Sequence, residues 1–151
     1  MTVLSAQTIR RLKLISPFNE RKVSKGRSFG LSCSGYDIRI AEDRWVWPLW
    51  GRLASAVERF DLPTHVCAEV KDKSTNARRF ITVQNTFIEP GWNGYLTLEI
   101  TRHLPWPLFI RKGTPIAQIV FSFLDEPTEQ PYHGKYQNQA AGPQAARNER
   151  G

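Results

Sequence analysis

The stretch YLTLEITRH, residues 95–103, alternates polar and apolar side chains, which is the pattern of a β-strand with one buried face. The apolar side chains on one side of this predicted strand are Leu96, Leu98 and Ile100. The polar side chains on the other side are Tyr95, Thr97, Glu99 and Thr101. A carboxylate, that of Glu99, therefore stands at the centre of a strand whose opposite side is apolar.

Similar short apolar segments follow one another from Gly35 onward. They are Tyr36–Ile40, Arg52–Phe60, His65–Val70, Phe80–Val83, Gly94–Thr101, Leu108–Ile110 and Ile116–Leu124. Turns rich in Pro and Gly separate them, because Pro presets φ and Gly tolerates positive φ. Many short strands at near-regular spacing predict an all-β fold, either a jelly-roll-like sandwich or a barrel. One short N-terminal helix is expected, with the Ser5 hydroxyl as its cap and Ile9 and Leu12 on its buried face.

The 151 residues have the length of a single domain. We expect the β domain to occupy residues 1–139. Residues 140–151 contain no large apolar side chain, so they are predicted to form a flexible C-terminal tail. The segment just before them, about 131–139, combines polar and aromatic residues, which suits a segment that becomes ordered on a ligand.

The net charge of +7 would suit a nucleic acid, but the basic residues are scattered and no dedicated nucleic-acid surface is predicted. A small polyphosphate ligand would use the same charge with fewer residues. Cys33 and Cys67 have no metal-type spacing and are expected to be small buried hydrophobes in a reducing compartment. Apolar runs such as Ile116–Phe123 fall well short of the roughly 20 residues that span a bilayer, so no membrane partner and a cytoplasmic location are expected.

The motifs of several hydrolase classes are absent from the sequence. Zinc deaminases need a His-x-Glu and a Pro-Cys-x-x-Cys motif to hold the metal and shuttle protons, and this chain has neither. It also lacks a Gly-x-Ser-x-Gly elbow and a Walker loop. Any chemistry would therefore come from Glu, Arg and Ser side chains. Three weak local signals fit this view: the stretch Lys73–Arg78, the turn at Glu89, and Glu99.

Taken together, five segments resemble the dCTP deaminase family of the dUTPase-like superfamily, in order and at compatible spacing. They are Ser34-Gly-Tyr-Asp-Ile-Arg39, Asp72-Lys-Ser-Thr-Asn-Ala-Arg-Arg79, Val83-Gln-Asn-Thr-Phe-Ile-Glu-Pro-Gly-Trp-Asn-Gly-Tyr-Leu-Thr-Leu-Glu99, Gly113-Thr-Pro-Ile-Ala-Gln118 and Gly134-Lys-Tyr-Gln-Asn-Gln139. The resemblance runs from about Ser5 to Pro143. It implies a dUTPase-like distorted jelly roll or β-barrel and the hydrolytic deamination of dCTP to dUTP and ammonia, for dUTP biosynthesis.

The resemblance also assigns roles to residues. Glu99 would activate the water that attacks cytosine C4, while Arg78 and Ser74 would position the water and stabilise the intermediate. Further substrate contacts are matched to Lys73, Thr75, Asn76, Ala77, Glu89, Trp92, Thr97, Leu98, Gln118, Tyr132, Lys135 and Gln139. Among these, Glu89 would hold the sugar 3′-hydroxyl, and the last three would lie on a lid at about 131–139.

The same resemblance implies Mg²⁺ carried by the substrate triphosphate, no zinc, a homotrimer with shared active sites, and dTTP as a feedback inhibitor. Two alternatives remain open: a bifunctional enzyme that continues to dUMP, and a nucleotide-sensing module without catalysis. Phe80 departs from the family pattern, which has Gly at that point, and could alter the preference for the base.

Overall fold

The computed structural model describes residues 2–24 and 26–149. Within these residues the helices are α1 (Ala6–Leu12) and α2 (Ser74–Ala77). The strands, in chain order, are β1 (Thr2–Val3), β2 (Ile15–Ser16), β3 (Lys22–Ser24), β4 (Arg27–Leu31), β5 (Tyr36–Arg39), β6 (Arg44–Val46), β7 (Arg52–Asp61), β8 (Val66–Asp72), β9 (Ile81–Val83), β10 (Phe87–Ile88), β11 (Asn93–Arg102), β12 (Leu108–Ile110) and β13 (Pro115–Phe123).

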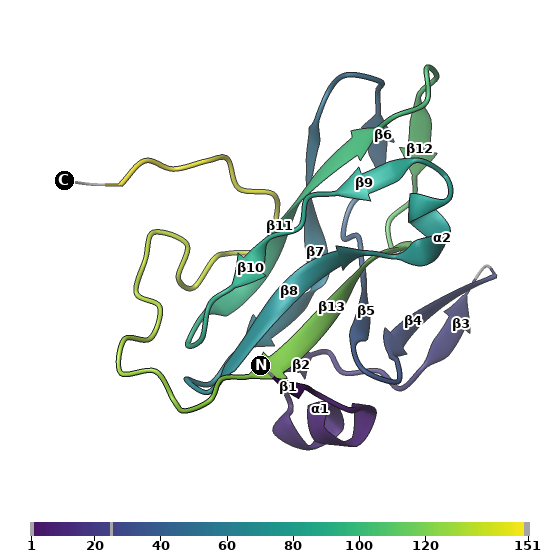
Figure 1. Cartoon of the computed structure of the whole chain (residues 1–151). Coiled ribbons are helices and arrows are strands. Elements are labelled where there is room, and N and C mark those ends of the chain that lie inside the picture. Colours follow the sequence, from purple (N-terminus) through teal and green to yellow (C-terminus); the bar gives the residue numbers. More distant parts are fainter. Residues whose placement is uncertain (1, 25, 150–151) are drawn as a thin grey trace.

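Two antiparallel sheets form the body of the molecule (Figure 1). The larger sheet has the order β10-β8-β13-β5-β4-β3, with β1 also paired to β13. The smaller sheet has the order β2-β7-β11-β9, and β6 pairs with β12 in a separate two-stranded ribbon. This arrangement confirms the predicted all-β, jelly-roll-like fold with a short N-terminal helix.

The hydrophobic core lies between the two larger sheets. The ring of Phe60 on β7 lies 6.4 Å from that of Phe121 on β13 and 6.2 Å from that of Trp92, measured between centroids. Leu98 and Ile100 of β11 are buried in the same core. Each such side chain contributes about 1.5–3 kcal/mol on burial, so the apolar side of β11 fixes which way its polar side faces.

The strands predicted from the sequence are all found, with ends shifted by at most two residues. Six further strands were not predicted: β1, β2, β3, β4, β6 and β10. Three of them span only two residues, which is too short to show the alternation of polar and apolar side chains that marks a strand. The hairpin of β3 and β4 was not predicted, because β3 is fully exposed and lacks an apolar side.

The predicted helix begins after Ser5, and Ile9 is buried as expected. The predicted cap is wrong in one respect, because the Ser5 hydroxyl bonds the Thr8 hydroxyl at 3.2 Å instead of a backbone N–H. Cys67 is buried as predicted, whereas Cys33 is exposed, contrary to expectation. None of the described helices is long and apolar enough to cross a membrane.

After β13 the chain turns back along the smaller sheet (Figure 1). Gln139 forms a parallel bridge with Gly94, the Tyr95 N–H donates to Gln139 O at 3.0 Å, and the Asn138 N–H donates to Asn93 O at 3.0 Å. Gly94 has a φ of +139°, and a Cβ there would lie 2.6 Å from Gln139 N, so the close approach requires glycine. The division at residue 139 into domain and flexible tail stays a prediction.

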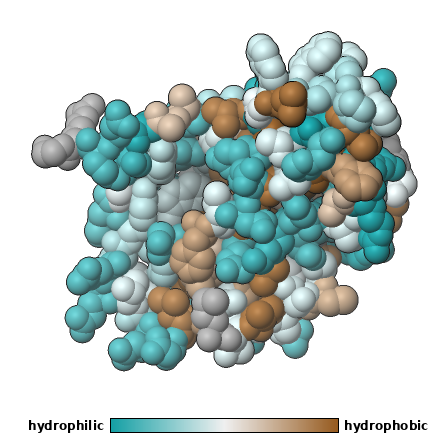
Figure 2. Space-filling model, turned by 45° about the horizontal axis from the view of Figure 1, so that its top comes forward, coloured by the Kyte–Doolittle hydropathy of each residue, from teal (hydrophilic) through white to brown (hydrophobic). Residues whose placement is uncertain are grey.

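Large apolar side chains are exposed at the end of the molecule that carries β6 and β12. The most exposed are Leu49, Trp50, Trp106, Trp47 and Trp45. Figure 2, which turns this end toward the viewer, shows hydrophobic side chains interspersed with hydrophilic ones. Exposed apolar surface of this kind is typical of an interaction site.

Candidate active site

Glu99 lies in the middle of β11, on the side that faces away from the core. Its neighbours Leu98 and Ile100 are buried, whereas Thr97 and Glu99 are half-buried. The alternation predicted from residues 95–103 is therefore confirmed. Leu53 of β7 is the antiparallel partner of Glu99, so the carboxylate emerges beside an apolar side chain of the next strand.

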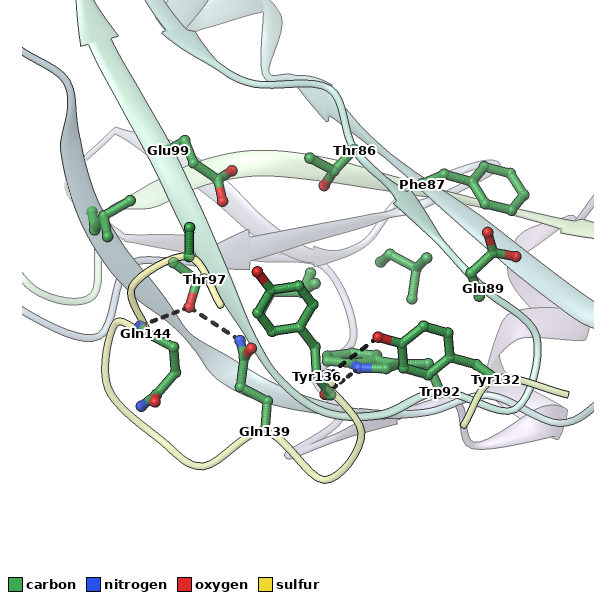
Figure 3. Close-up of a pocket in the computed structure, with 14 residues that line it drawn as sticks. Thr86, Phe87, Glu89, Trp92, Thr97, Glu99, Tyr132, Tyr136, Gln139 and Gln144 are labelled. Carbon is green, nitrogen blue, oxygen red and sulfur yellow. Dashed lines mark hydrogen bonds between the residues drawn. The ribbon is translucent and has the colours of Figure 1, made fainter. Parts of the chain in front are cut away.

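A cavity of about 460 Å³ opens on this side of β11 (Figure 3). Its walls come from β10, β11 and the C-terminal segment. The predicted site residues that line it are Glu89, Trp92, Thr97, Glu99, Tyr132 and Gln139. Among the described residues, no Lys or Arg side chain lines it. The cavity thus holds two carboxylates and no cation.

The Glu99 carboxylate is poised to accept a proton. Burial raises the pKa of Glu99, and its own backbone N–H offsets part of that rise. No described side chain pairs with it. From the sequence, Glu99 could instead be a solvated strand residue paired with Arg102 or Lys112. The pairing with Arg102 is not found, because the Arg102 guanidinium donates to Arg79 O at 2.7 Å and to Trp106 O at 3.4 Å.

The C-terminal segment forms the opposite wall of the cavity. Trp92 Nε1 donates to Tyr136 O at 2.7 Å, and the Tyr136 N–H donates to the Tyr132 hydroxyl at 3.1 Å. Gln139 Nε2 donates to Tyr95 O at 2.8 Å and to Thr97 Oγ1 at 3.0 Å. These bonds hold the predicted lid residues against β11.

Sequence reasoning missed several residues that line this cavity, among them Phe87, Tyr136 and Gln144. Figure 3 shows the Tyr136 ring extending into the cavity between Thr97 and Trp92. Tyr136 stands within the motif Gly134–Gln139, so the alternation of aromatic and polar residues there was an available signal. Phe87 also lies within a quoted segment, Val83–Glu99, whereas Gln144 carries no local signal, because only the packing of distant segments brings it to the cavity.

The stretch around α2 lies outside this cavity. Ser74, Thr75, Ala77 and Arg78 are exposed and line no part of it. Arg78 Nη1 donates to Ser74 O at 3.5 Å, which joins the two predicted catalytic residues within one turn. The structure of a single chain therefore brings Ser74 and Arg78 together but does not bring them to Glu99.

Asn76 and Leu98 are buried, and each has a structural role. Asn76 Nδ2 donates to Pro115 O at 3.1 Å and to Ile116 O at 3.0 Å, which fastens α2 to the start of β13. The Leu98 side chain points into the core, so only its backbone faces the cavity side of β11.

A second polar group lies near α2. Lys73 Nζ pairs with Asp37 Oδ2 and donates to Ser28 Oγ at 3.3 Å. Gln118 stands opposite Asp37 in the β13–β5 ladder, and its Nε2 donates to Ser32 Oγ at 3.2 Å. These two predicted substrate contacts, Lys73 and Gln118, thus form one cluster with Asp37, which sequence reasoning did not select.

Lys135 lies on the C-terminal segment, where it pairs with Glu149 at 3.1 Å and its ammonium lies 5.4 Å from the Tyr136 ring centroid. Glu89 is exposed at the edge of the cavity. No cluster of three or more His, Cys, Asp or Glu side chains in residues 2–24 and 26–149 is placed to hold a metal ion. One buried polar atom in the same part of the chain, Asp37 Oδ1, has no hydrogen-bond partner.

Comparison with solved structures defines the class of the fold. The 2′-deoxycytidine 5′-triphosphate deaminase from Agrobacterium tumefaciens superposes with a TM-score of 0.68 at 17% identity, over 82% of this chain and 48% of that chain. The EIAV dUTPase superposes with a TM-score of 0.58 at 15% identity, over 81% of this chain and 97% of that chain. The protein has a dUTPase-like fold.

Comparison of sequences defines the family. A dCTP deaminase-like family model matches residues 50–124. The dCTP deaminase of Gemmatimonas aurantiaca is 35% identical over 83% of this chain and 86% of its own length. That of Acidobacterium capsulatum is 34% identical over 92% of this chain and 96% of its own length. The chain belongs to the dCTP deaminase family, which confirms the resemblance and the enzyme class inferred from the sequence.

Proposed function

We propose that the protein hydrolyses dCTP to dUTP and ammonia, with Glu99 as the base that activates water. The observation that carries this proposal is the half-buried Glu99 carboxylate, unpaired among described side chains and with a raised pKa, in the cavity beneath the C-terminal segment. A carboxylate with a pKa moved toward neutrality can both take up and return a proton. Such an enzyme would draw on the deoxynucleotide pool of the cytoplasm.

In the proposed reaction, Glu99 takes a proton from water as the oxygen attacks C4 of the cytosine ring. Glu99 delivers this proton to N3 of the ring, then takes the second proton from the new C4 hydroxyl and passes it to N4. The C4–N4 bond breaks, N4 leaves as ammonia, and C4 keeps the oxygen as a carbonyl. No zinc takes part in this proposal. Positioned acid–base catalysis contributes roughly 10²–10⁴-fold, and fixed donors aimed at the developing charge contribute more.

We propose further that the active site is shared between the subunits of a homotrimer. The cavity around Glu99 contains two carboxylates and no Lys or Arg among the described residues, so by itself it would repel a triphosphate. The cationic stretch at α2 is exposed and would supply the missing charge from a neighbouring chain. The exposed tryptophans at the β6–β12 end also favour association, because assembly would bury apolar surface.

Within this shared site, Ser74 and Arg78 would position the water and stabilise the intermediate, and Lys73, Thr75, Ala77 and Gln118 would bind the phosphates. The side-chain amide of Asn76 is already bonded, so Asn76 would act by holding α2 in place. Mg²⁺ would arrive on the triphosphate. Among the described residues no group of three or more His, Cys, Asp or Glu side chains could hold the ion, so the triphosphate itself would supply its ligands.

The base and the sugar would lie in the cavity itself. The backbone at Thr97 and Leu98 would read the cytosine edge, Glu89 would hold the 3′-hydroxyl, and Trp92 would contact the deoxyribose. Tyr132, Lys135 and Gln139 would close over the nucleotide as a lid. The feedback inhibitor is proposed to be dTTP, which would compete for the same cavity.

A second candidate is a bifunctional enzyme that continues to dUMP. It is favoured by the exposed Glu89 carboxylate at the edge of the same cavity, where a second water could be activated. A regulatory module without catalysis is the other alternative. Separating the products formed from dCTP distinguishes the three: dUTP with ammonia, dUMP with pyrophosphate and ammonia, or no product.

The catalytic assignment is tested with Glu99→Gln. This variant is expected to bind dCTP and to release no ammonia, because the amide has the same shape but cannot accept the proton. Glu69→Gln is the matched control, since Glu69 also lies on a strand but pairs at the surface with Lys71 at 2.8 Å. Robust turnover by Glu99→Gln would defeat the assignment.

A further inference from the structure

A second cavity, of about 470 Å³, lies between the β3–β4 hairpin, β12 and the segment that leads into β13. Four of the side chains that line it are cationic: Arg27, Arg39, Arg111 and Lys112. Among the described residues, no Asp or Glu lines it. Its charge is therefore the reverse of that of the cavity around Glu99.

One of the four cations is already neutralised. Arg39 Nε donates to Glu58 Oε1 at 2.8 Å, and the Arg39 guanidinium lies 4.7 Å from the centroid of the Phe29 ring. Glu58, the acidic member of this ion pair, is buried. Arg39 therefore contributes to the wall of the cavity more than to its net charge.

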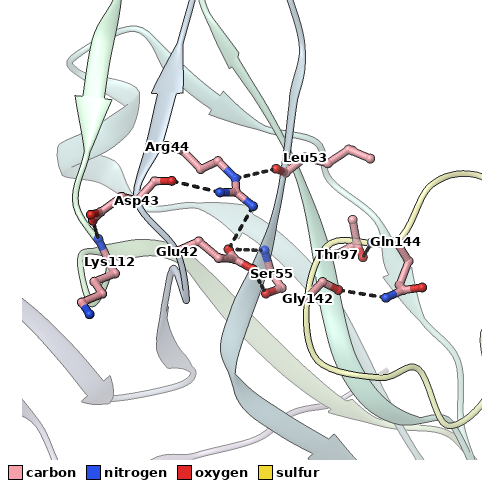
Figure 4. Close-up of polar contacts among 9 residues, drawn as sticks. All are labelled: Glu42, Asp43, Arg44, Leu53, Ser55, Thr97, Lys112, Gly142 and Gln144. Atoms are coloured by element: carbon pink, nitrogen blue, oxygen red, sulfur yellow. Dashed lines mark hydrogen bonds and ion pairs between the residues drawn. The ribbon is translucent and has the colours of Figure 1, made fainter.

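The other three cations remain available. Arg111 and Lys112 are exposed, and neither side chain forms a hydrogen bond or ion pair with a described residue. The nearby carboxylate of Asp43 is occupied by the Lys112 backbone N–H at 2.7 Å, and Figure 4 shows the Lys112 ammonium pointing away from it. Arg27 Nη1 makes one long bond, 3.4 Å, to Asn76 Oδ1.

The loop that carries two of these cations is held in place from both sides. Asp43 anchors Lys112, and the neighbouring Glu42 accepts from the Ser55 N–H at 3.0 Å and lies 3.9 Å from Arg44 (Figure 4). The Gly113 N–H also donates to Ile40 O at 2.7 Å. A fixed loop presents its charges at constant positions, which lowers the cost of ordering them on a ligand.

Aromatic surface accompanies the charge. Phe29 and Phe109 line the cavity, and Phe109 is partly exposed while its ring lies 5.1 Å from that of Trp45, measured between centroids. A planar group could therefore stack on Phe109 while an anion is held by Arg111 and Lys112. Stacking of a base on an aromatic side chain is a recurrent mode of nucleotide binding.

We propose that this second cavity binds a polyphosphate, separately from the substrate site. Three unneutralised cations match a chain of phosphates, which accepts charge-assisted hydrogen bonds from Arg and Lys. The volume lies within the usual range for small-molecule sites. The polyphosphate can come from a nucleoside triphosphate or from inorganic phosphate chains, and Phe109 distinguishes the two sources.

The site also connects to α2. Arg27 contacts both the cavity and Asn76, and Asn76 fastens α2 to β13. A ligand that draws Arg27 into the cavity would release Asn76 Oδ1 and so disturb the stretch that carries Ser74 and Arg78. This regulatory extension rests on the proposed function, whereas polyphosphate binding does not.

The experiment titrates the full-length protein with inorganic tripolyphosphate and, separately, with dATP, and follows the amide NMR resonances of Gly113 and Thr114. Arg111→Ala/Lys112→Ala is expected to weaken binding by about tenfold or more, because each charge-assisted contact is typically worth about a factor of ten. Arg11→Ala/Arg21→Ala removes the same charge from exposed positions elsewhere and is expected to change the affinity by less than about twofold.

Phe109→Ala identifies the source of the ligand. Weaker binding of dATP with unchanged binding of tripolyphosphate assigns a nucleotide, and an equal affinity of the wild-type protein for both probes assigns the phosphate chain alone. Either result supports the site. The absence of shifts at Gly113 and Thr114, or an equal loss in the Arg11→Ala/Arg21→Ala control, would overturn it.

The effect on catalysis is measured separately. dATP is expected to lower the rate of ammonia release by the wild-type protein and not by Arg111→Ala/Lys112→Ala. Glu99→Gln is expected to leave the Gly113 titration unchanged. If the wild-type protein releases no ammonia from dCTP, the proposed function fails, and the titration still decides whether the second site exists.

Discussion

Gln139 Nε2 donates to Thr97 Oγ1 at 3.0 Å, and this bond joins the C-terminal segment to the strand that carries Glu99. The same Thr97 hydroxyl accepts from the Gln144 backbone N–H, also at 3.0 Å. One side chain, two residues from Glu99 on the same side of β11, thus anchors two points of the segment that covers the cavity.

Thr97→Val tests this anchor. Valine keeps the β-branched shape and removes both bonds, each worth about 0.5–1.5 kcal/mol, so the segment should open more often. The expected result is faster hydrogen exchange of the Gln144 amide and a KM for dCTP raised severalfold. Thr101→Val is the matched control, because Thr101 lies on the same side of β11 and does not line the cavity. Equal exchange at Gln144 in both variants would contradict the anchor.

The environment of Glu99 predicts the pH dependence of catalysis. Because burial raises the pKa of Glu99, the base is available only above a pH that exceeds the ordinary glutamate value of about 4.3. The acidic limb of kcat/KM should therefore lie above that value. Leu53→Ala admits water beside the carboxylate and should move the limb to lower pH. Val57→Ala is the control, because Val57 lies on the same strand and outside the cavity, and it should leave the acidic limb of kcat/KM in place. If Leu53→Ala does not move this limb, burial is not the cause of the raised pKa.

The same shift has a consequence for folding. The native state holds the Glu99 proton to a higher pH than the unfolded chain does, so stability falls as pH rises from the ordinary pKa through the raised one. Glu99→Gln removes the ionisation. The stability of the wild-type protein relative to this variant should therefore decrease across that window, measured by urea unfolding at a series of pH values. A constant difference would contradict the raised pKa.

Phe80 offers a test of backbone strain beside the proposed catalytic turn. Its φ is +56°, a conformation that costs an L-residue roughly 1–2 kcal/mol and costs glycine almost nothing. Phe80→Gly should therefore be more stable than Phe80→Ala by about 1 kcal/mol in urea unfolding. Phe87, an exposed strand residue whose φ is not positive, is the control, and there Ala should be the more stable replacement. The same order at both positions would rule out strain at Phe80.

The sequence predicted what depends on local pattern. The alternation from Tyr95 to Thr101 placed Glu99 on the correct side of β11, because burial of the apolar side leaves the strand one orientation. Pattern could not reveal β3, which has no buried side, or Asp37, whose unpartnered oxygen results from the packing of three segments. The separation of Glu99 from Arg78 also lies beyond pattern, because the spacing of two motifs in the sequence does not fix the distance between them in the folded chain.

That separation leads to the last prediction. If Glu99 of one subunit works with Arg78 of its neighbour, Glu99→Gln and Arg78→Ala should each be inactive alone and active when assembled together. In a random mixture, half of the subunits keep Glu99 and half keep Arg78, so about a quarter of the heterologous interfaces contain both. About a quarter of wild-type activity is then expected from a one-to-one mixture unfolded and refolded together.

The control is the double variant Glu99→Gln/Arg78→Ala refolded with the wild-type protein, which retains both residues in the same subunits. If the site were complete within one chain, this control would keep half of the activity and the mixture of single variants would have none. If the site is shared, the control and the mixture should give the same activity, because each interface draws its two residues from independent subunits. Equal recovery in the two mixtures is thus the signature of a site in which α2 of one chain supplies the charge that the Glu99 cavity of the next chain lacks.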